Sequence, residues 1–73
     1  MLDISIIIPC YNEELFIENC IHSILNFPLE KDKYEIILID GDSTDNTRDI
    51  ITRLKEKYSQ IKLLIKKGRF HMH

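Results

Sequence analysis

Three short runs of almost unbroken aliphatic residues recur along the chain, at positions 4–8, 34–39 and 61–65. Apolar side chains at consecutive positions, rather than at alternate ones, are typical of parallel strands that are covered on both faces. Polar or turn-forming segments, which begin at Pro9 and Asp40, end the first two runs. The pattern therefore predicts three short strands of one parallel sheet.

The two stretches between these runs have the periodicity of amphipathic helices. In the first stretch the apolar positions recur at i, i+3, i+4, i+7 and i+8 and are Ile17, Cys20, Ile21, Ile24 and Leu25. In the second stretch they are Ile50, Ile51, Leu54 and Tyr58. We expect Asn12 to cap the first helix and Pro28 to follow its end, whereas the turn-forming segment 42–47 precedes the second helix.

The resulting order, β-α-β-α-β, predicts an α/β fold with a three-stranded parallel sheet over residues 1–65 and an irregular tail over residues 66–73. Right-handed crossovers between the strands place both helices on the same face of the sheet. The other face then stays uncovered although it is apolar, which is unusual for a soluble monomer. We therefore expect either that the chain is the N-terminal part of a longer domain, which we favour, or that it self-associates through this face.

Composition and charge exclude several classes of protein. The 14 Ile and 8 Leu among 73 residues are too many for a disordered chain. A net charge of −2 without a basic stripe argues against a nucleic-acid partner. Cys10 and Cys20 fit neither a disulfide framework nor a zinc site, and we expect both to be reduced packing residues. No apolar run approaches the ~20 residues that span a bilayer, so a cytoplasmic location is expected.

The most distinctive polar segments, 9–14 and 40–45, follow the first two strands. Ligands of open parallel sheets bind beyond the carboxyl ends of the strands, where these segments would face each other. Tyr11 offers a flat ring for a planar base, and Asp40 offers a carboxylate acceptor. The helix N-termini behind both segments would supply free backbone N–H groups. These features suit a nucleotide, although neither a Rossmann nor a P-loop glycine pattern is present.

Two motifs at this spacing carry a family resemblance. The first is Ile6-Ile7-Ile8-Pro9-Cys10-Tyr11-Asn12-Glu13-Glu14, and the second is Ile37-Leu38-Ile39-Asp40-Gly41-Asp42-Ser43-Thr44-Asp45-Asn46-Thr47. Together they resemble the N-terminal nucleotide-binding half of a family 2 glycosyltransferase with the GT-A fold. The exopolysaccharide (succinoglycan-type) branch is the most similar. The resemblance covers the chain from about residue 4 to residue 65.

The resemblance implies a site for a nucleotide-diphosphate sugar, with a UDP-sugar as the expected donor. Pro9 and Tyr11 match residues that line the base pocket, and Glu13 matches an acid near the nucleoside. Asp40 matches an aspartate that contacts uracil or ribose. Many family members have Asp-Asp-Gly-Ser at this point, whereas this chain has Asp-Gly-Asp-Ser over residues 40–43. Its second acid, Asp42, is therefore displaced by one residue. The implied acceptor is a glycan or a lipid-linked molecule in polysaccharide synthesis, and the intact protein would act in the cytoplasm or at the cytoplasmic face of the membrane.

Family members also carry a later Asp-x-Asp, which holds a divalent cation (Mg or Mn), and a carboxylate base. No Asp or Glu follows Glu56 in this chain. We therefore expect no catalytic residue and no metal ligand within these 73 residues, and no sugar transfer by this chain alone.

Other interpretations remain open. The chain could be a small non-catalytic α/β module that self-associates through its uncovered sheet face. A receiver-like or flavodoxin-like domain shares the strand order but would need paired acids or a phosphate loop after the first strand. Ser43, Thr44 and Asp45 are also explained as turn and cap residues that bind no ligand. Arg48 is expected on a solvated helix face, and the pair His71 and His73 is expected in a frayed terminus rather than at a metal.

Overall fold

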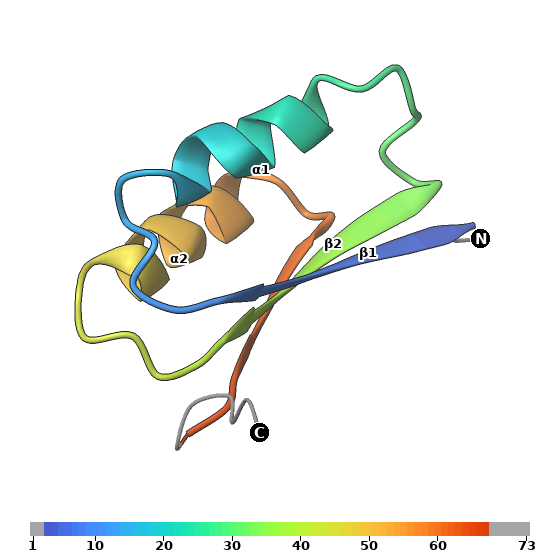
Figure 1. Ribbon diagram of the computed structural model, residues 1–73. Helices are drawn as coiled ribbons and strands as arrows, with labels where there is room; N and C mark the ends of the chain where they lie inside the picture. Colours follow the sequence, from blue (N-terminus) through green and yellow to red (C-terminus); the bar gives the residue numbers. More distant parts are fainter. Residues whose placement is uncertain (1–2, 68–73) are drawn as a thin grey trace.

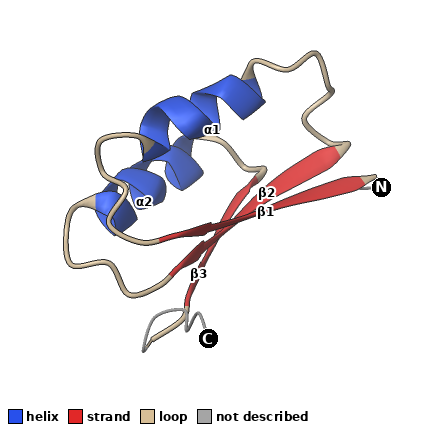
Figure 2. Ribbon diagram, viewed as in Figure 1, coloured by secondary structure: helices blue, strands red, loops and turns tan. Residues whose placement is uncertain are grey.

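The computed structural model describes residues 3–67 and confirms the predicted α/β fold. The elements in chain order are β1 (Ile4–Cys10), α1 (Ile17–Leu25), β2 (Tyr34–Asp40), α2 (Thr47–Lys57) and β3 (Ile61–Ile65). Both helices lie on one side of the sheet, as Figures 1 and 2 show. The predicted placement of both helices on one face is therefore confirmed. Within the predicted tail, residues 66 and 67 follow β3, whereas residues 68–73, with His71 and His73, lie outside the described residues.

All three strands run parallel, with β2 in the middle of the order β1-β2-β3. Ile36 of β2 is opposite Ile6 of β1 and Ile61 of β3. The ladder continues past both ends, because Asp3 N donates to Lys33 O at 2.8 Å and Lys66 N donates to Asp40 O at 2.7 Å. This register sets Cys10 directly beside Asp40 and so brings the loops that follow β1 and β2 next to each other.

The core lies between the sheet and the two helices. Its members are buried apolar side chains, and they are Cys10, Ile17, Ile21, Tyr34, Ile36, Leu38, Ile51, Leu54 and Ile61. In β2 every second residue is buried, which is the alternation that a sheet covered on one side requires. The central strand therefore contributes three core residues, Tyr34, Ile36 and Leu38, whereas each edge strand contributes one.

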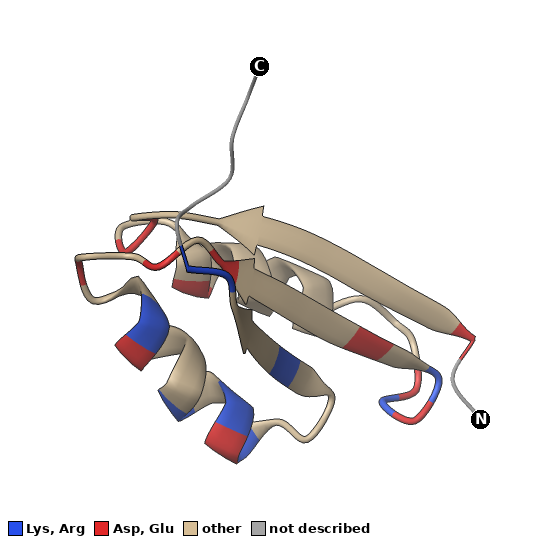
Figure 3. Ribbon diagram, turned by 90° about the horizontal axis from the view of Figure 1, so that it is seen from below, with Lys and Arg blue, Asp and Glu red and all other residues tan. Residues whose placement is uncertain are grey.

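The opposite side of the sheet forms what we call the uncovered face, and it consists of Ser5, Ile7, Pro9, Glu35, Ile37, Ile39, Lys62 and Leu64, which share one side by register. Ile7 and Leu64 are 59% and 57% exposed. Seen from this side in Figure 3, the strands carry few charged positions, whereas α2 carries both signs of charge. The strand sequences thus indicate two apolar faces, of which residues 3–67 cover one.

The predicted start of the first helix is wrong. Helix α1 begins at Ile17, after a turn in which the amides of Phe16 and Ile17 both donate to Glu13 O. Asn12 lies outside the helix in the left-handed region, with φ of 52°, where asparagine is tolerated better than most residues. Asn12 therefore does not cap α1, and its side chain bonds elsewhere.

The two cysteines occupy different environments. Cys10 is buried at the end of β1, as predicted, but Cys20 is exposed and the prediction that it packs in the core is wrong. Ile17 and Ile21 are the buried residues of α1, and Cys20 lies at the margin of their stripe, beside the open edge of β1. Neither helix in the described part of the chain is long and apolar enough to cross a membrane. The cytoplasmic location stays a prediction.

Candidate functional site

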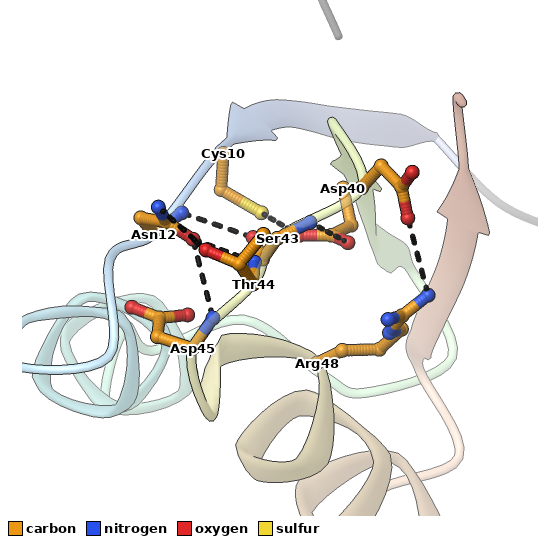
Figure 4. A network of polar contacts seen from close by, with 8 residues as sticks. Cys10, Asn12, Asp40, Ser43, Thr44, Asp45 and Arg48 are labelled. Carbon is orange, nitrogen blue, oxygen red and sulfur yellow. Dashed lines mark hydrogen bonds and ion pairs between the residues drawn. The ribbon is translucent and has the colours of Figure 1, made fainter. Parts of the chain in front are cut away.

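Two polar loops meet at the carboxyl edge of the sheet. We call residues 11–16, after β1, the first loop and residues 41–46, after β2, the second loop. Gly41 N donates to Cys10 O at 2.8 Å and so carries the strand pairing into the loops. Figure 4 shows side chains of both loops pointing toward each other. The predicted convergence of the two segments is therefore present in the structure.

Asp40 closes the turn at the end of β2. Its side chain is fully buried, and both of its carboxylate oxygens are engaged by Ser43. Ser43 N donates to Oδ2 at 3.0 Å and Ser43 Oγ donates to Oδ1 at 2.5 Å, while the Cys10 thiol lies 4.0 Å from Oδ1. A direct contact between Asp40 and a nucleotide stays a prediction, because in this arrangement the carboxylate stabilises its own loop.

Asp42 adopts a left-handed conformation, with φ of 69°, and its side chain is 44% exposed. Its Oδ1 lies 3.8 Å from Arg48 Nη1, so the guanidinium of α2 faces the second loop. A pair of half-exposed charges like this one contributes only ~0–1 kcal/mol to folding. Arg48 is thus half-buried beside a loop carboxylate rather than wholly on a solvated helix face.

The backbone amides of the two loops are bonded reciprocally to side chains of the opposite loop or of α2. In the first loop, three consecutive amides donate across the gap: Asn12 N to Ser43 Oγ at 2.9 Å, Glu13 N to Thr47 Oγ1 at 2.7 Å and Glu14 N to Asp45 Oδ2 at 3.3 Å. In the second loop, Thr44 N and Asp45 N donate to Asn12 Oδ1 at 2.8 and 3.3 Å, and Asn46 N donates to Glu14 Oε1 at 3.3 Å. We call this set the interloop network.

The interloop network corrects one expectation from the sequence. We expected free N–H groups at both helix N-termini, ready to bind a phosphate. Side chains accept the amides of the loops that lead into the helices, because Ser, Thr, Asp and Asn side chains compete well for loop amides. The first amide of each helix is also engaged, since Ile17 N donates to Glu13 O at 2.8 Å and Thr47 N donates to Asp45 Oδ1 at 2.9 Å.

Residues 43–45 form a turn, and most of their partners lie in the first loop. Asp45 Oδ1 accepts the Thr47 amide at 2.9 Å, but Asn46, the residue before α2, makes no side-chain cap bond. That residues 43–45 bind no ligand stays a prediction.

Thr47, the first residue of α2, forms hydrogen bonds with residues of both loops. It is fully buried, and its hydroxyl donates to Asp45 Oδ1 at 2.5 Å while it accepts the Glu13 amide. Desolvation raises the pKa of the Asp45 carboxyl, but hydrogen bonds from the Thr47 side chain and from the Thr47 and Glu14 backbones outweigh it and leave the pKa below its ordinary value. The charged carboxylate therefore stabilises the fold above about pH 4, and this contribution is lost as the pH falls through the lowered pKa.

The remaining predicted site residues lie on the β1 side. Pro9 is exposed at the end of β1, Tyr11 is half-buried, and Glu13 is exposed in the first loop. Pro9 and Glu13 line a hollow of about 280 Å³, together with Ile8, Cys10, Phe16, Ile17 and Cys20. The structure thus brings the β1 residues beside the Asp40 and Asp42 turn. Sequence reasoning missed the bridging roles of Asn12 and Thr47, whose partners lie 31 to 34 positions away.

Residues 5–72 match the family described as Glycosyl transferase family 2. The chain belongs to this family. The match spans nearly the whole sequence and confirms the resemblance carried by the two loop motifs.

By their names, relatives of this family 2 chain are glycosyltransferases that act on poly(ribitol-phosphate) or on a dolichyl-linked sugar. The chain is 43% identical over 60 residues to a poly(ribitol-phosphate) beta-glucosyltransferase of Bacillus spizizenii, which covers 82% of this chain and 10% of that protein. It is 46% identical over 56 residues to a dolichyl N-acetyl-alpha-D-glucosaminyl phosphate 3-beta-D-2,3-diacetamido-2,3-dideoxy-beta-D-glucuronosyltransferase of Methanococcus voltae, which covers 77% of this chain and 17% of that protein. The chain therefore spans only a tenth to a sixth of the length of these relatives.

Solved structures show the same fold. A mannosyltransferase from Pyrobaculum calidifontis, in complex with GDP-Man and Mn²⁺, aligns with a TM-score of 0.79 at 26% identity over 97% of this chain and 21% of that one. S. aureus TarS aligns with a TM-score of 0.75 at 27% identity over 90% of this chain and 11% of that one. The sheet and helices of this family 2 chain thus have the arrangement of the N-terminal part of a GT-A glycosyltransferase.

The mannosyltransferase complex shows that a divalent cation occurs among structural neighbours of this family 2 chain. Within residues 3–67 no group of three His, Cys, Asp or Glu side chains is arranged to hold a metal ion. The carboxylates nearest the loops are also engaged, since Asp40 binds Ser43 and Asp45 binds Thr47. These residues do not fit a metal site, and we assign no step of a reaction through a metal to them.

The two thiols of this family 2 chain should differ sharply in reactivity. Burial, and after it the nearby carboxylates of Asp40, Glu13 and Asp45, raise the pKa of the Cys10 thiol to about 11. Only about 0.1% of Cys10 is then thiolate at pH 8, and reaction requires the thiolate. We expect iodoacetamide at pH 8 to label the exposed Cys20 and to leave Cys10 unmodified, as measured by mass spectrometry of peptides. Equal labelling of both thiols in the folded protein would contradict the buried position of Cys10.

Proposed function

We propose that the chain forms the donor-nucleotide-binding part of a glycosyltransferase that transfers a sugar from a nucleotide-diphosphate sugar to a glycan or lipid-linked acceptor in polysaccharide synthesis. The observation that carries the proposal is the meeting of the two loops at the carboxyl edge of the parallel sheet, where open α/β sheets bind ligands. The presence of GDP-Man in a structural neighbour supports it.

Within this proposal, Tyr11 supplies a ring on which the base stacks, and Pro9 shapes the wall beside it. Glu13 is exposed and lines the hollow, and in this proposal its carboxylate contacts the nucleoside. Asp42 has a half-exposed carboxylate, which leaves it accessible to a sugar hydroxyl or a base N–H. Asp40 contributes by fixing the turn, and its direct contact with uracil or ribose would require the loop to open, because Ser43 occupies both oxygens.

The donor in this proposal is a UDP-sugar, with a GDP-sugar as the alternative that the mannosyltransferase complex suggests. No general base and no metal ligand is assigned within residues 3–67. We therefore propose that the chain alone binds the donor without turning it over. Release of free sugar or transfer to an acceptor during a titration with the 73-residue chain would contradict this part of the proposal.

The substitution Tyr11→Ala tests the site. Stacking of a base on an aromatic ring contributes ~1–3 kcal/mol to the free energy of binding. We therefore expect the dissociation constant for UDP or GDP, measured by isothermal titration calorimetry, to rise ~5- to 150-fold. Phe27→Ala is the matched control, because Phe27 is an exposed aromatic residue beyond the far end of α1. Nucleotide binding that is unchanged in Tyr11→Ala, or absent from the unaltered chain, would overturn the proposal.

The uncovered face favours a second candidate function, a module that self-associates. Seven paired residues in each of β1 and β2 and five in β3, at about 3.3 Å per residue and about 4.8 Å between strands, give this face a flat footprint of only roughly 300 Å². A stable interface buries about 800 Å² on each partner, so this face alone supports a weak dimer at most. We therefore rank this function second.

Sedimentation velocity tests the second candidate. If it holds, the chain forms dimers at high micromolar concentration, and the substitution Leu64→Lys, in the edge strand β3 of the uncovered face, returns it to a monomer. The exposed Leu15 of the first loop provides the control Leu15→Lys, which should not change the sedimentation coefficient. A monomer at all concentrations would exclude self-association through this face.

A further inference from the structure

We propose that Thr47 and Asn12 are positioning residues of the donor site, which hold the first loop in its binding conformation without touching the nucleotide. The inference rests on the proposed function, because it concerns how the same site gains affinity. Both residues belong to the interloop network, and each holds backbone amides of the loop opposite to it. Asn12 lies between the two residues that we assign to the nucleotide, Tyr11 and Glu13, and Thr47 holds the amide of Glu13.

The geometry at Thr47 concentrates two bonds on one buried hydroxyl. Its Oγ1 accepts the Glu13 amide at 2.7 Å and donates to Asp45 Oδ1 at 2.5 Å. Asp45 in turn accepts the Glu14 amide through its other oxygen at 3.3 Å. One side chain at the start of α2 therefore fixes the orientation of two consecutive peptide units of the first loop, either directly or through Asp45.

Asn12 connects the first loop to the second loop through its side chain. Its Oδ1 accepts the amides of Thr44 and Asp45, at 2.8 and 3.3 Å, and its Nδ2 donates to Thr44 Oγ1 at 3.2 Å. Asn12 holds this position with φ of 52°, a conformation that most residues avoid. The backbone between Tyr11 and Glu13 is thus set by bonds to the second loop and not by helix α1, which begins only at Ile17.

Preorganisation of this kind changes affinity without a contact to the ligand. A loop that is ordered before binding does not lose its conformational freedom when the nucleotide arrives, so less of the interaction free energy is spent on ordering. Loss of the Thr47 hydroxyl leaves the part-buried Glu13 amide without an acceptor, which favours conformations in which this segment moves away from α2. We therefore expect weaker binding although every nucleotide contact is still present in the sequence.

Valine at position 47 removes the hydroxyl and keeps the shape of the side chain. In Thr47→Val we expect amide hydrogen exchange at Glu13 and Glu14 to accelerate at least about tenfold, as for the loss of one buried hydrogen bond, and the dissociation constant for UDP or GDP to rise about tenfold. Thr47→Ser keeps the hydroxyl and should restore both values to within about twofold of the original. The matched control is Thr52→Val on the same helix, because the Thr52 hydroxyl bonds only within α2, to Arg48 O.

Glycine at position 12 provides a second variant, in case Thr47→Val does not fold. Glycine adopts the positive φ without cost and removes the side-chain acceptor. We expect Asn12→Gly to accelerate exchange at Thr44 and Asp45 and to weaken nucleotide binding by a similar factor, while Asn19→Gly on the exposed side of α1 lowers stability without changing affinity at a temperature where the protein is folded.

The outcomes separate the inference from the proposed function. If the unaltered chain binds nucleotide and folded Thr47→Val and Asn12→Gly bind it equally well, the positioning role is overturned and the proposed function stands. A merely structural role would show the same result: lower global stability, unchanged affinity, and exchange at Glu13 that follows global unfolding. If the unaltered chain binds no nucleotide, the proposed function fails and this inference fails with it.

Discussion

Truncation of Leu38 to alanine should abolish or nearly abolish the folded state. Leu38 is fully buried at the centre of β2, where it packs between the sheet and both helices. Loss of a core leucine costs ~2–5 kcal/mol, which approaches the whole stability of ~5 kcal/mol that a small domain has. We expect the cooperative urea transition, followed by circular dichroism at 222 nm, to move to very low urea or to disappear.

A leucine on the other face of the same sheet supplies the control. Leu64 of β3 is 57% exposed on the uncovered face, so Leu64→Ala removes little buried area. We expect it to change the free energy of unfolding by less than about 1 kcal/mol. Equal losses for Leu38→Ala and Leu64→Ala would show that the uncovered face is covered in solution, and would favour self-association over the monomer.

Truncation of Asp40 to alanine should destabilise the protein about as strongly, before any effect on a ligand. It leaves the Ser43 amide and hydroxyl without their acceptor in a fully buried turn. Each buried polar group that loses its partner costs ~1–3 kcal/mol, so we expect the loss of two such bonds to lower the free energy of unfolding by about 2–6 kcal/mol. The measurement is again urea unfolding, and heat-induced unfolding should show a correspondingly lower midpoint.

Two variants frame this second prediction. Asp40→Asn keeps one oxygen acceptor and should lose clearly less stability than Asp40→Ala. Asp32→Ala removes an exposed acid from the connection between α1 and β2 and should be nearly neutral. A folded Asp40→Ala protein with unchanged stability and reduced nucleotide affinity would assign Asp40 to the nucleotide and not to the turn.

The fold was predictable because its signals are local. Each strand follows from a run of apolar residues, and the shared face of the helices follows from the handedness of the crossovers. The buried side chains of α1, Ile17 and Ile21, are also those that the periodicity selects. Cys20 was mispredicted because a cysteine at the margin of an apolar stripe has no local feature that distinguishes burial from exposure.

The candidate site was predictable in its place but not in its bonding. The motifs and the topology put the two loops at one edge of the sheet, as the structure has them. The role of Asn12 could not be read from its neighbours, because Asn before a helix is ordinarily a cap and its actual partners, Thr44 and Asp45, lie more than 30 positions away. The burial of Asp40 was missed for a different reason: its partner Ser43 lies only three positions away, but a strand-end acid is equally suited to a ligand and to a turn.

The reciprocity of the interloop network bears on protein engineering. The backbone amides of each loop donate hydrogen bonds largely to side chains of the other loop. Neither loop would therefore keep its conformation if it were transferred alone to another protein. A chimera that takes only the segment after β1 from a homologue would bring acceptors for Thr44 and Asp45 that no longer match. To change donor specificity by exchanging segments between homologues, both loops and the first residue of α2 therefore have to be transferred together.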